Sequence, residues 1–296
     1  MNILDGKATA GKIKQRIAAD LASLPEAVQR PQLAAVLVGH NGASETYVAA
    51  KVKACNEIGF GSKLIRFADN VSENELLACI QQLNEDNSVH GIIVQLPLPQ
   101  HIDEQKVTMA VKVEKDVDGF HPENLGRLML QLPGFVSATP KGILMLLEEY
   151  KIETSGKHCV VLGRSNIVGT PVSLLMSRNA FPGNSTVSLC HSKTKDLALL
   201  TKQADILIAA LGRPQFVTAE MVKQGAVVID VGITRVADTT TPKGYRIAGD
   251  VDFEKVAPKT SWITPVPGGV GAMTIAALMQ NTYLAWQRIT SSDATR

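Results

Sequence analysis

The sequence predicts an α/β fold that is divided into two domains. Its 296 residues are enough to bury a sizeable core, and a chain of this length favours two domains over one. Short apolar runs alternate along the chain with segments of helical period. This alternation is typical of parallel βαβ units, which bind ligands at the carboxyl ends of their strands.

The composition argues against several classes of protein. Hydrophobic residues make up 45% of the chain and charged residues 20%, as in ordinary soluble globular proteins. The net charge of +2 argues against a nucleic-acid or membrane surface built on charge, so we expect neither partner. The amino-terminal segment is polar, and no apolar run approaches the ~18 residues of a membrane span, so we expect no secretory signal.

The cysteines point to a reducing compartment. Cys55, Cys79, Cys159 and Cys190 are widely spaced and form no Cys-x-x-Cys pattern. This spacing suggests neither a disulfide framework nor a zinc site. We therefore expect no bound metal and a cytoplasmic location.

The first series of strands and helices covers roughly the first third of the chain. We expect strands at 32–39, 62–68 and 90–99, the last ending in a proline-rich loop. Ser44 is the expected N-cap of the helix after the first strand. Ser72 and Glu75 form a capping box after the second, since each side chain can satisfy a backbone N–H group near the other residue.

A second series begins near Thr139, and we expect the domain boundary between Pro133 and Thr139, where the segment 132–140 breaks both periods. Thr139 and Pro140 are the expected N-cap and first residue of a helix. Four near-continuous apolar runs at 157–163, 185–191, 204–211 and 226–232 are typical of strands covered on both faces. The polar segment 234–250 is expected to be a surface excursion, and the last helix to cover 272–289.

A glycine-rich turn indicates a nucleotide site in the second series. Gly163, Ser165 and Gly169 occupy the places of G-x-G-x-x-x-G, between a strand and a helix. Glycine lets the backbone approach a phosphate, and the helix N-terminus favours negative charge. Tight strand–helix turns can also need glycine for steric reasons alone. The regular series of strands around this turn favours a dinucleotide site.

The residues near this turn favour NADP over NAD. NAD-binding domains place an acidic residue at the end of the next strand, to bind the ribose 2′-hydroxyl. Here that strand ends in His191, Ser192 and Lys193, and Arg164 lies in the turn itself. The alternative is a solvated basic loop, but two cations and a hydroxyl suit a 2′-phosphate better.

A tyrosine and a lysine lie one helical turn apart in the first domain. Tyr47 and Lys51 flank an apolar stripe formed by Val48, Val52, Cys55 and Ile58. Alone, the pair is more simply explained as a lysine that extends its amine to solvent beside a tyrosine at the edge of the core.

Three other features give the pair a functional context. Gln95 follows an apolar strand directly, Asp118 precedes a glycine turn, and 265–271 is a glycine-rich approach to a helix N-terminus that can close on a flat ligand. Asp before Gly is otherwise a common turn-capping residue, and from the residues alone the two roles have about even weight.

Short-chain dehydrogenases also use Tyr-x-x-x-Lys, but downstream of the dinucleotide glycines and in the same domain. Here Lys51 precedes Gly163 by 163 − 51 = 112 residues and belongs to the other domain. We therefore reject that family. We expect the pair to face the cofactor across a cleft.

An ordered set of motifs resembles the bifunctional methylenetetrahydrofolate dehydrogenase/methenyltetrahydrofolate cyclohydrolase family. The resemblance extends from Asp5-Gly6-Lys7 to the final helix. Its motifs are YVAAKVKACNEIGF, GIIVQLPLPQHID, KDVDGFHPENLGRL, VVLGRSNIVGTPVSLL, CHSKT, ADILIAALGRP, VIDVGI and TPVPGGVGAMT. Two departures are visible, because Ser137-Ala138 replaces the family's usual Pro-Cys, and Ala272 replaces a proline.

The resemblance implies an amino-terminal catalytic domain, 1–136, to which a carboxyl-terminal helix within 268–296 returns. It implies a Rossmann-type NADP-binding domain, 137–267, and a homodimer. The implied reactions are NADP-dependent oxidation of 5,10-methylenetetrahydrofolate to the methenyl compound, and hydrolysis of that compound to 10-formyltetrahydrofolate.

The resemblance also assigns residues to roles. Lys51 is the expected general acid/base, or the group that orients the water, if desolvation and the cationic substrate suppress its charge. Gln95 holds Lys51, Tyr47 packs on the folate, and Asp118 accepts from the pterin. The implied contacts of the folate are Tyr47, Lys51, Gln95, Asp118, Pro267, Gly268 and Gly269. Those of NADP are Gly163, Arg164, Ser165, Ile167, His191, Ser192 and Ile233.

Two alternatives stay open at this point. A monofunctional dehydrogenase of the same fold is disfavoured by Lys51 and Gln95. A non-catalytic NADP-sensing module is distinguished by whether NADPH forms from methylenetetrahydrofolate and NADP. A ligase is disfavoured because the chain has no G-x-x-x-x-G-K-[ST] loop for ATP.

Overall fold

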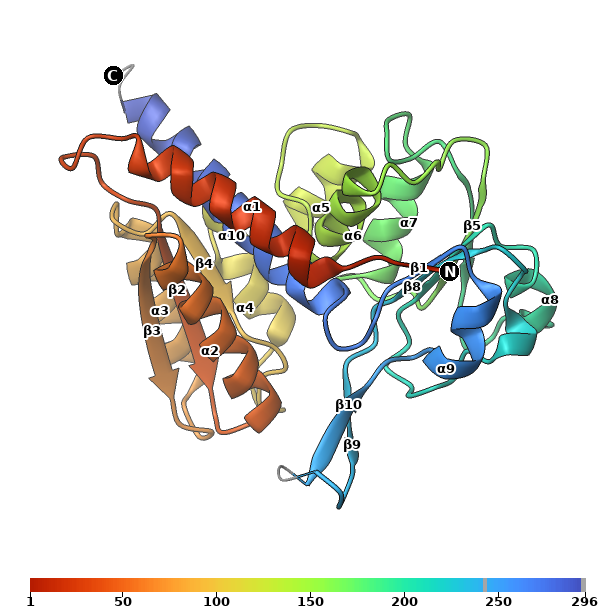
Figure 1. The fold of residues 1–296 in the computed structure, drawn as a ribbon. Helices are drawn as coiled ribbons and strands as arrows, with labels where there is room; N and C mark the ends of the chain where they lie inside the picture. Colours follow the sequence, from red (N-terminus) through yellow and green to blue (C-terminus); the bar gives the residue numbers. More distant parts are fainter. Residues whose placement is uncertain (242–243, 294–296) are drawn as a thin grey trace. The chain divides into compact units, whose positions relative to one another are not determined.

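The computed structural model describes residues 1–241 and 244–293, which divide into two compact units (Figure 1). The six-stranded unit comprises Met1–Ala10 and Thr139–Thr274. The three-stranded unit comprises Gly11–Ala138 and the described residues from Ile275 onward. Three helices contribute residues to both units: α1 (Gly6–Ala22), α10 (Val270–Asp293) and, by its first residue, the helix that begins at Ala138. The carboxyl-terminal part of α10 thus belongs with the first predicted domain.

The three-stranded unit contains the three strands predicted in the first series. They are β2 (Gln32–Val38), β3 (Gly61–Phe67) and β4 (Gly91–Val94), and they form a parallel sheet in the order β3-β2-β4. The helices of this unit are α2 (Gly42–Glu57), α3 (Glu73–Glu85), α4 (Glu104–Ala110) and α5 (Pro122–Met129), with a short 3₁₀ turn at Val113–Lys115.

Packing in this unit follows the strand period of two. Ala34, Val36 and Val38 of β2 face one core together with Leu76 and Ile80 of α3. The alternate residues of β2 are also buried, so this strand is covered on both faces. Its near-continuous apolar run reflects that position.

One of the two predicted helix starts in this unit is confirmed and the other is wrong. Ser72 and Glu75 form the expected capping box of α3. The helix α2, however, begins at Gly42, and the side chain of Asn41 accepts from the N–H groups of Ala43 and Ser44. Asn and Ser are about equally good N-caps, and the earlier residue caps this helix.

The six-stranded unit contains a fully parallel sheet in the order β1-β11-β8-β7-β5-β6. The four predicted strands are β5 (His158–Leu162), β6 (Thr186–Cys190), β7 (Ile206–Ala209) and β8 (Val227–Asp230). Two short strands, β1 (Asn2–Ile3) and β11 (Trp262–Ile263), extend the edge beyond β8. The strand order reverses at β5, whose neighbours are β6 and β7.

Helices and turns complete this unit. They are α6 (Ala138–Glu149), α7 (Gly169–Ser177), α8 (Leu197–Thr201), α9 (Phe253–Val256) and 3₁₀ turns at Ala219–Met221 and Ala257–Lys259. Since α6 begins at Ala138, Thr139 lies inside the helix and the prediction that it is the N-cap is wrong. Ala has the highest helix propensity, so Ala138 favours a helix that starts one residue before the predicted N-cap.

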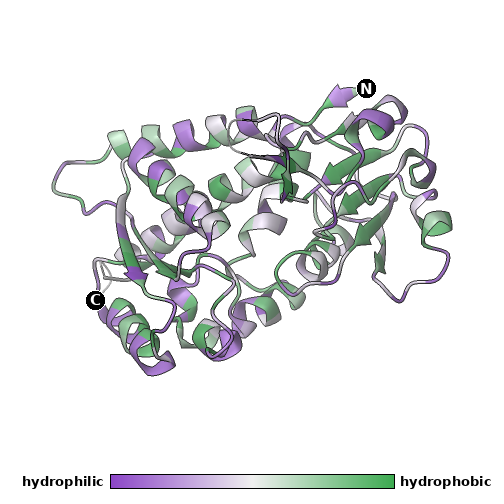
Figure 2. Cartoon of the chain, turned by 90° about the horizontal axis from the view of Figure 1, so that it is seen from below, coloured by the Kyte–Doolittle hydropathy of each residue, from purple (hydrophilic) through white to green (hydrophobic). Residues whose placement is uncertain are grey.

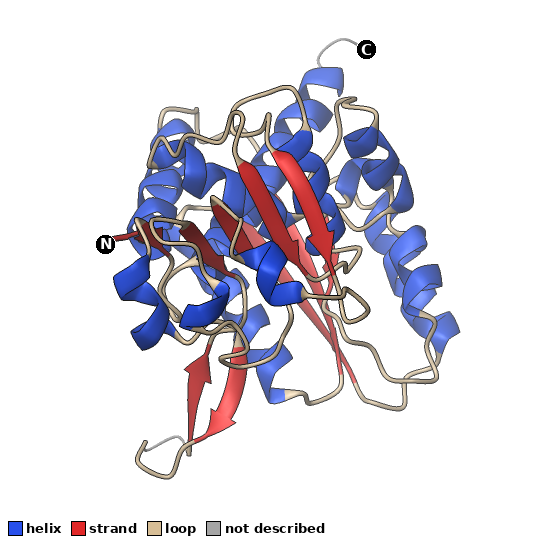
Figure 3. Cartoon of the chain, turned by 90° about the vertical axis from the view of Figure 1, so that its right-hand side faces the viewer, coloured by secondary structure: helices blue, strands red, loops and turns tan. Residues whose placement is uncertain are grey.

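The polar segment 234–250 contains an antiparallel hairpin (Figure 3). Its strands are β9 (Thr234–Ala237) and β10 (Tyr245–Ala248), and residues 242–243 lie outside the described residues. The guanidinium of Arg235 lies 4.6 Å from the ring centroid of Tyr245 on the paired strand. Among the described residues these two strands form a separate two-stranded sheet, which agrees with the predicted surface excursion.

The core of the six-stranded unit lies against its sheet, whose strands are largely hydrophobic in Figure 2. Val160, Leu162, Leu207, Ala209 and Val228 contribute to one cluster of this core. Within the described residues, every helix is too short or too polar to cross a membrane.

Candidate functional site

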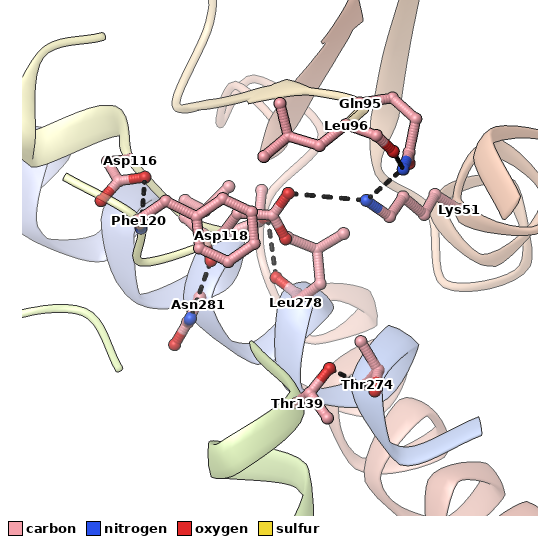
Figure 4. Close-up of polar contacts among 12 residues, drawn as sticks. Lys51, Gln95, Leu96, Asp116, Asp118, Phe120, Thr139, Thr274, Leu278 and Asn281 are labelled. Carbon is pink, nitrogen blue, oxygen red and sulfur yellow. Dashed lines mark hydrogen bonds and ion pairs between the residues drawn. The ribbon is translucent and has the colours of Figure 1, made fainter. Parts of the chain in front are cut away.

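The amine of Lys51 lies in a buried polar cluster of the three-stranded unit (Figure 4). Its Nζ donates to Oε1 of Gln95 over 3.3 Å and lies 3.5 Å from Oδ2 of Asp118. The side chain of Lys51 is 4% exposed and that of Asp118 is 10% exposed. The explanation that Lys51 extends its amine to solvent is therefore wrong, because the amine is held inside by an amide and a carboxylate.

Three separate segments position this cluster. Lys51 lies on α2, Gln95 follows the last residue of β4, and Asp118 lies in the turn before α5. The backbone N–H of Gln95 continues the β4 ladder by donating to Val36, and its Nε2 donates to the carbonyl of Leu96. The amide is thus oriented with its oxygen towards Lys51.

The turn around Asp118 is capped by a different acid, which sequence reasoning missed. The carboxylate of Asp116 accepts from the N–H groups of Phe120 and His121 and from Nδ2 of Asn124. Burial raises the pKa of Asp116, and these three donors oppose the shift. The turn-capping role considered for Asp118 belongs to Asp116, and the Asp118 carboxylate faces Lys51.

Two further residues hold this turn in place. Asn281 on α10 donates to the carbonyls of Val117 and Val136. The hydroxyl of Ser137 donates to the carbonyl of Gly119, whose φ of +72° requires glycine and whose added Cβ would lie 2.6 Å from the Ser137 nitrogen. Ser137, one of the two departures from the family pattern, therefore supports the turn that carries Asp118.

Tyr47 lies one turn before Lys51 and is half-buried. The Lys51 amine lies 5.5 Å from the centroid of its ring, within the range of a cation–π contact. Nearby Cys55 is no nucleophile, because burial raises the pKa of its thiol to about 12. The chemistry available here is that of an amine, a carboxylate, an amide and a phenol.

Lys51, Gln95 and Asp118 are called the lysine cluster below. The predicted glycine loop at 265–271 lies in the other unit, the six-stranded one. Pro267 is exposed, Gly268 has φ of +106°, and Gly269 is buried. The N–H of Lys7 donates to the carbonyl of Gly268, and a Cβ on Gly6 would lie 2.1 Å from the Gly269 oxygen. The Asp5-Gly6-Lys7 segment thus packs directly on the loop.

The predicted nucleotide turn joins β5 to α7. Gly163 has φ of +110°, and a Cβ there would lie 2.1 Å from the carbonyl oxygen of Ala210. A Cβ on Gly169 would lie 1.9 Å from the Gly163 oxygen. Only glycine fits either position. The Ser165 hydroxyl accepts from the N–H groups of Val168 and Gly169, which leaves its own hydrogen free to donate.

The basic residues near this turn lie at the carboxyl ends of two neighbouring strands. Leu162 of β5 is in register with Cys190 of β6, so Arg164 and the 191–193 turn follow adjacent strand ends. Arg164, Ser192 and Lys193 are exposed. The ring of His191 accepts from the N–H of Lys193 and so stiffens this turn.

Two predicted apolar contacts of the cofactor are exposed. Ile167 is 39% exposed in the turn before α7, and Ile233 is 50% exposed after β8. A Cβ on Gly271 would lie 2.7 Å from Cδ1 of Ile233. Both side chains are therefore accessible at the surface, and that of Ile233 lies where Gly271 permits close approach.

The predicted residues thus form two groups. Tyr47, Lys51, Gln95 and Asp118 come together in the three-stranded unit, and the other predicted residues lie in the six-stranded unit. Asp116 and Asn281 were missed, although Asp116 two residues before Asp118 was a readable signal. Among the described residues there is no group of three or more His, Cys, Asp or Glu side chains that could hold a metal.

These features define a class of protein. A parallel sheet whose order reverses at a glycine turn is typical of dinucleotide-binding domains, and a buried lysine beside a carboxylate and an amide is typical of an enzyme active site. The chain is an α/β enzyme with a dinucleotide-binding domain.

Comparison with known proteins gives the family. The model of the tetrahydrofolate dehydrogenase/cyclohydrolase NAD(P)-binding domain matches residues 137–290, and that of the catalytic domain of the same family matches residues 4–118. The bifunctional protein FolD of Porphyromonas gingivalis is 62% identical over 284 residues, which cover 96% of each chain.

Solved structures agree. The crystal structure of the bifunctional enzyme FolD from Campylobacter jejuni matches with a TM-score of 0.89 and 48% identity over 97% of this chain and 99% of that one. The Trypanosoma brucei dehydrogenase-cyclohydrolase, complexed with NADP cofactor and inhibitor, matches with a TM-score of 0.91 and 38% identity over 96% of each chain. The chain belongs to the tetrahydrofolate dehydrogenase/cyclohydrolase family.

Proposed function

We propose that the chain is a bifunctional enzyme of folate one-carbon metabolism that uses NADP. The proposal is carried by the family match over nearly the whole chain together with the buried contact of Lys51 with Gln95 and Asp118. The first reaction oxidises 5,10-methylenetetrahydrofolate to the 5,10-methenyl compound. The second hydrolyses that compound to 10-formyltetrahydrofolate.

The dehydrogenase step needs little acid–base help. A hydride leaves the carbon that bridges N5 and N10, taking both electrons of its C–H bond, and reduces the nicotinamide ring. The bridging carbon becomes a delocalised amidinium cation, and no proton is released. Catalysis then consists mainly of holding the donor carbon and the nicotinamide in contact.

The cyclohydrolase step needs proton transfer. Water adds to the methenyl carbon, the bond from that carbon to N5 breaks, and one proton is released. We assign Lys51 as the general acid/base or the group that orients the water. Gln95 and Asp118 support this assignment. Gln95 accepts a hydrogen bond from the Lys51 amine and Asp118 pairs with it, so the amine is held in one orientation.

The remaining substrate contacts are proposals of the same kind. Tyr47, half-buried beside Lys51, packs on the folate. Asp118 accepts from the amino and ring N–H donors of the pterin. This is favoured because Asp116, and not Asp118, caps the turn, which leaves the Asp118 carboxylate available to a ligand. Pro267, Gly268 and Gly269 offer a flat backbone surface for a planar ligand.

The NADP contacts divide by the part of the cofactor that they meet. Gly163, Ser165 and Ile167 surround the pyrophosphate at the start of α7, where the free hydroxyl hydrogen of Ser165 can donate. Arg164, His191 and Ser192 bind the 2′-phosphate, supported by the adjacent ends of β5 and β6. Ile233 meets the nicotinamide half.

Several wider assignments rest on the family resemblance. We propose a catalytic domain at 1–136 with 268–296, an NADP-binding domain at 137–267, a homodimer, and a cytoplasmic location. Tetrahydrofolate derivatives are the proposed ligands, and neither nucleic acid nor membrane is a proposed partner. The product would serve purine, methionine and histidine biosynthesis.

A spectrophotometric assay tests the function. The protein is incubated with methylenetetrahydrofolate and either NADP or NAD, while absorbance follows NADPH or NADH and the methenyl compound. We expect NADPH to form without accumulation of the methenyl compound. Failure to form NADPH would favour a sensing module, and accumulation of the methenyl compound would favour a monofunctional dehydrogenase.

A further inference from the structure

Two buried carboxylates lie at the carboxyl edge of the six-stranded sheet and have no part in the assignments above. Asp230 ends β8 and is 3% exposed, and Asp250 follows β10 and is 0% exposed. A buried carboxylate is stable only when its oxygens accept several hydrogen bonds. The donors to both side chains are backbone N–H groups of loops at this edge.

Asp250 holds the loop that follows β7. Its Oδ2 accepts from the N–H groups of Leu211 and Gly212 over 2.6 and 3.0 Å, and its Oδ1 accepts from Arg213 over 2.8 Å. Three successive backbone donors therefore converge on one side chain. The loop is fixed by a residue 37 to 39 positions further along the chain.

Asp230 holds the base of the β9–β10 hairpin. Its Oδ1 accepts from Gly232 over 3.0 Å and from the backbone N–H of Asp250 over 2.8 Å, and its Oδ2 accepts from Val251 over 3.0 Å. Gly232 lies just before the hairpin, and Asp250 and Val251 lie just after it. The hydrogen bond from the backbone N–H of Asp250 to Oδ1 of Asp230 connects the two acidic residues directly.

Glycines make room for both carboxylates. A Cβ on Gly249 would lie 1.9 Å from Oδ2 of Asp230. A Cβ on Gly232 would lie 2.4 Å from Oδ1 of Asp250. The backbone approaches each acid more closely than any other residue permits, so the arrangement depends on the sequence at four positions.

The loops held in this way are those that a dinucleotide meets. In doubly wound sheets, ligands bind where the strand order reverses, here between β5 and β7. The Gly163 turn ends β5, and a Cβ there would lie 2.1 Å from the oxygen of Ala210, which precedes the loop bound by Asp250. Ile233, the proposed nicotinamide contact, follows Gly232, which is bound to Asp230.

We propose that Asp230 and Asp250 are positioning residues for the nicotinamide half of the dinucleotide. Asp250 fixes residues 211–213 beside the reversal point, and Asp230 fixes Gly232 and thereby Ile233. Neither acid touches a reacting atom. Their joint effect is to hold two loops at one separation, so that the nicotinamide ring is bound in a single orientation. This inference rests on the proposed use of NADP.

The test replaces each acid by its amide. In Asp250→Asn and Asp230→Asn, an NH₂ group faces backbone N–H donors, so at least one donor in each loop loses its acceptor. We expect the KM for NADP to rise roughly tenfold or more and the kcat of hydride transfer to fall, while hydrolysis of the methenyl compound stays within about twofold of wild type.

A matched control separates this effect from general damage. Asp205 accepts from the N–H of His158 and pairs with Lys223 at the opposite edge of the same sheet. Asp205→Asn should leave the KM for NADP and the ratio of the two activities unchanged. Calorimetric titration with NADP gives an independent measure of binding for each folded variant.

The outcomes are distinguishable from failure of the proposed function. If the wild-type protein forms no NADPH, the proposed function fails. If it does, and both amide variants bind and reduce NADP as the wild type does, the positioning role alone is overturned. A parallel loss of both activities in both variants also overturns it, because a merely structural role predicts that result. If one variant does not fold, the other decides.

Discussion

The nucleotide turn and the lysine cluster are built in opposite ways. The turn at Gly163 is local, depends on backbone geometry, and leaves Arg164 and Ile167 exposed. The lysine cluster brings together side chains from residues 51, 95 and 118 and buries them. A ligand proposed for the turn would meet exposed side chains, whereas the lysine cluster holds a buried amine beside a carboxylate. The two sites should therefore respond differently to substitution.

The largest effect is expected at Lys51. Lys51→Met keeps most of the side-chain volume but removes the amine, so hydrolysis of the methenyl compound should fall by roughly 10²–10⁴-fold. Some hydride transfer should persist. The exposed Lys53→Met is the control, since the Lys53 side chain is 78% exposed. Equal loss of both activities would mean that Lys51 only shapes the site.

The same substitution also tests the buried pair. It leaves the Asp118 carboxylate buried without its cation, which should lower the free energy of unfolding by about 3–5 kcal/mol. Thermal denaturation of Lys51→Met and Lys53→Met measures the difference. Both activities are compared at a temperature where each variant is folded.

The next largest effect is expected at Asp118. Asp118→Ala removes the proposed acceptor for the pterin and should weaken folate binding by roughly 10- to 100-fold. Calorimetric titration with a folate measures it, and NADP affinity should be unchanged. Asp103→Ala is the control, because Asp103 caps α4 at an exposed helix start. An unchanged folate affinity in Asp118→Ala would rule out the proposed contact of Asp118 with the pterin.

A smaller and more selective effect is expected at Arg164. Arg164→Ala should raise the KM for NADP roughly tenfold and alter the KM for NAD much less, since NAD has no 2′-phosphate. Arg66→Ala, a substitution of an exposed arginine on β3, should change neither. Proportional changes in the KM for both cofactors would contradict the proposed contact of Arg164 with the 2′-phosphate.

The remaining predictions concern the pH dependence of stability, and one group in each unit should respond with opposite sign. In the three-stranded unit, burial and then the charge of Lys115 lower the pKa of His90 from 6.5 to about 4. The unfolded chain takes up this proton below its own pKa of 6.5 and the folded chain does not, so stability is lost as the pH falls from 6.5 towards 4. At about pH 5 the loss is about 2 kcal/mol.

In the six-stranded unit, burial raises the pKa of Asp230 from 3.8 to about 6. The folded chain keeps this proton to higher pH than the unfolded chain, so stability falls as the pH rises from 3.8 through 6. Melting temperatures of His90→Asn, which retains an acceptor for the N–H of Gln32, and of Asp230→Asn are compared with wild type across this range. If the difference in melting temperature between variant and wild type changed with pH in the same direction for both variants, the opposite pKa shifts assigned to His90 and Asp230 would be contradicted.

Most of the sheet architecture was predictable because buried parallel strands have near-continuous apolar runs. The seven predicted strands are present, and they differ from the predicted ranges mainly at their ends. The strands β1 and β11 were not predictable, since two residues have no detectable period and their pairing joins residue 2 to residue 262. The hairpin at 234–248 was missed because its strands are only four residues long and lie in a segment rich in polar and turn-forming residues.

The nucleotide turn was predictable because its glycines are close in sequence. The contacts of Lys51 were harder, since helix α2 alone gave no sign that its amine is buried. Gln95 was a candidate because it follows a strand directly, and Asp118 was a candidate because it precedes a glycine. The division of labour between Asp116 and Asp118, and the link between Asp230 and Asp250, depend on which backbone N–H groups converge in three dimensions.

The most direct test of the account is hydrolysis of the methenyl compound by the wild-type protein without any nicotinamide cofactor. Because the lysine cluster is proposed to perform this step with its own side chains, hydrolysis should proceed far above the spontaneous rate. Hydrolysis at the spontaneous rate, both without NADP and with it, would contradict the assignment of a second activity to Lys51 and its neighbours.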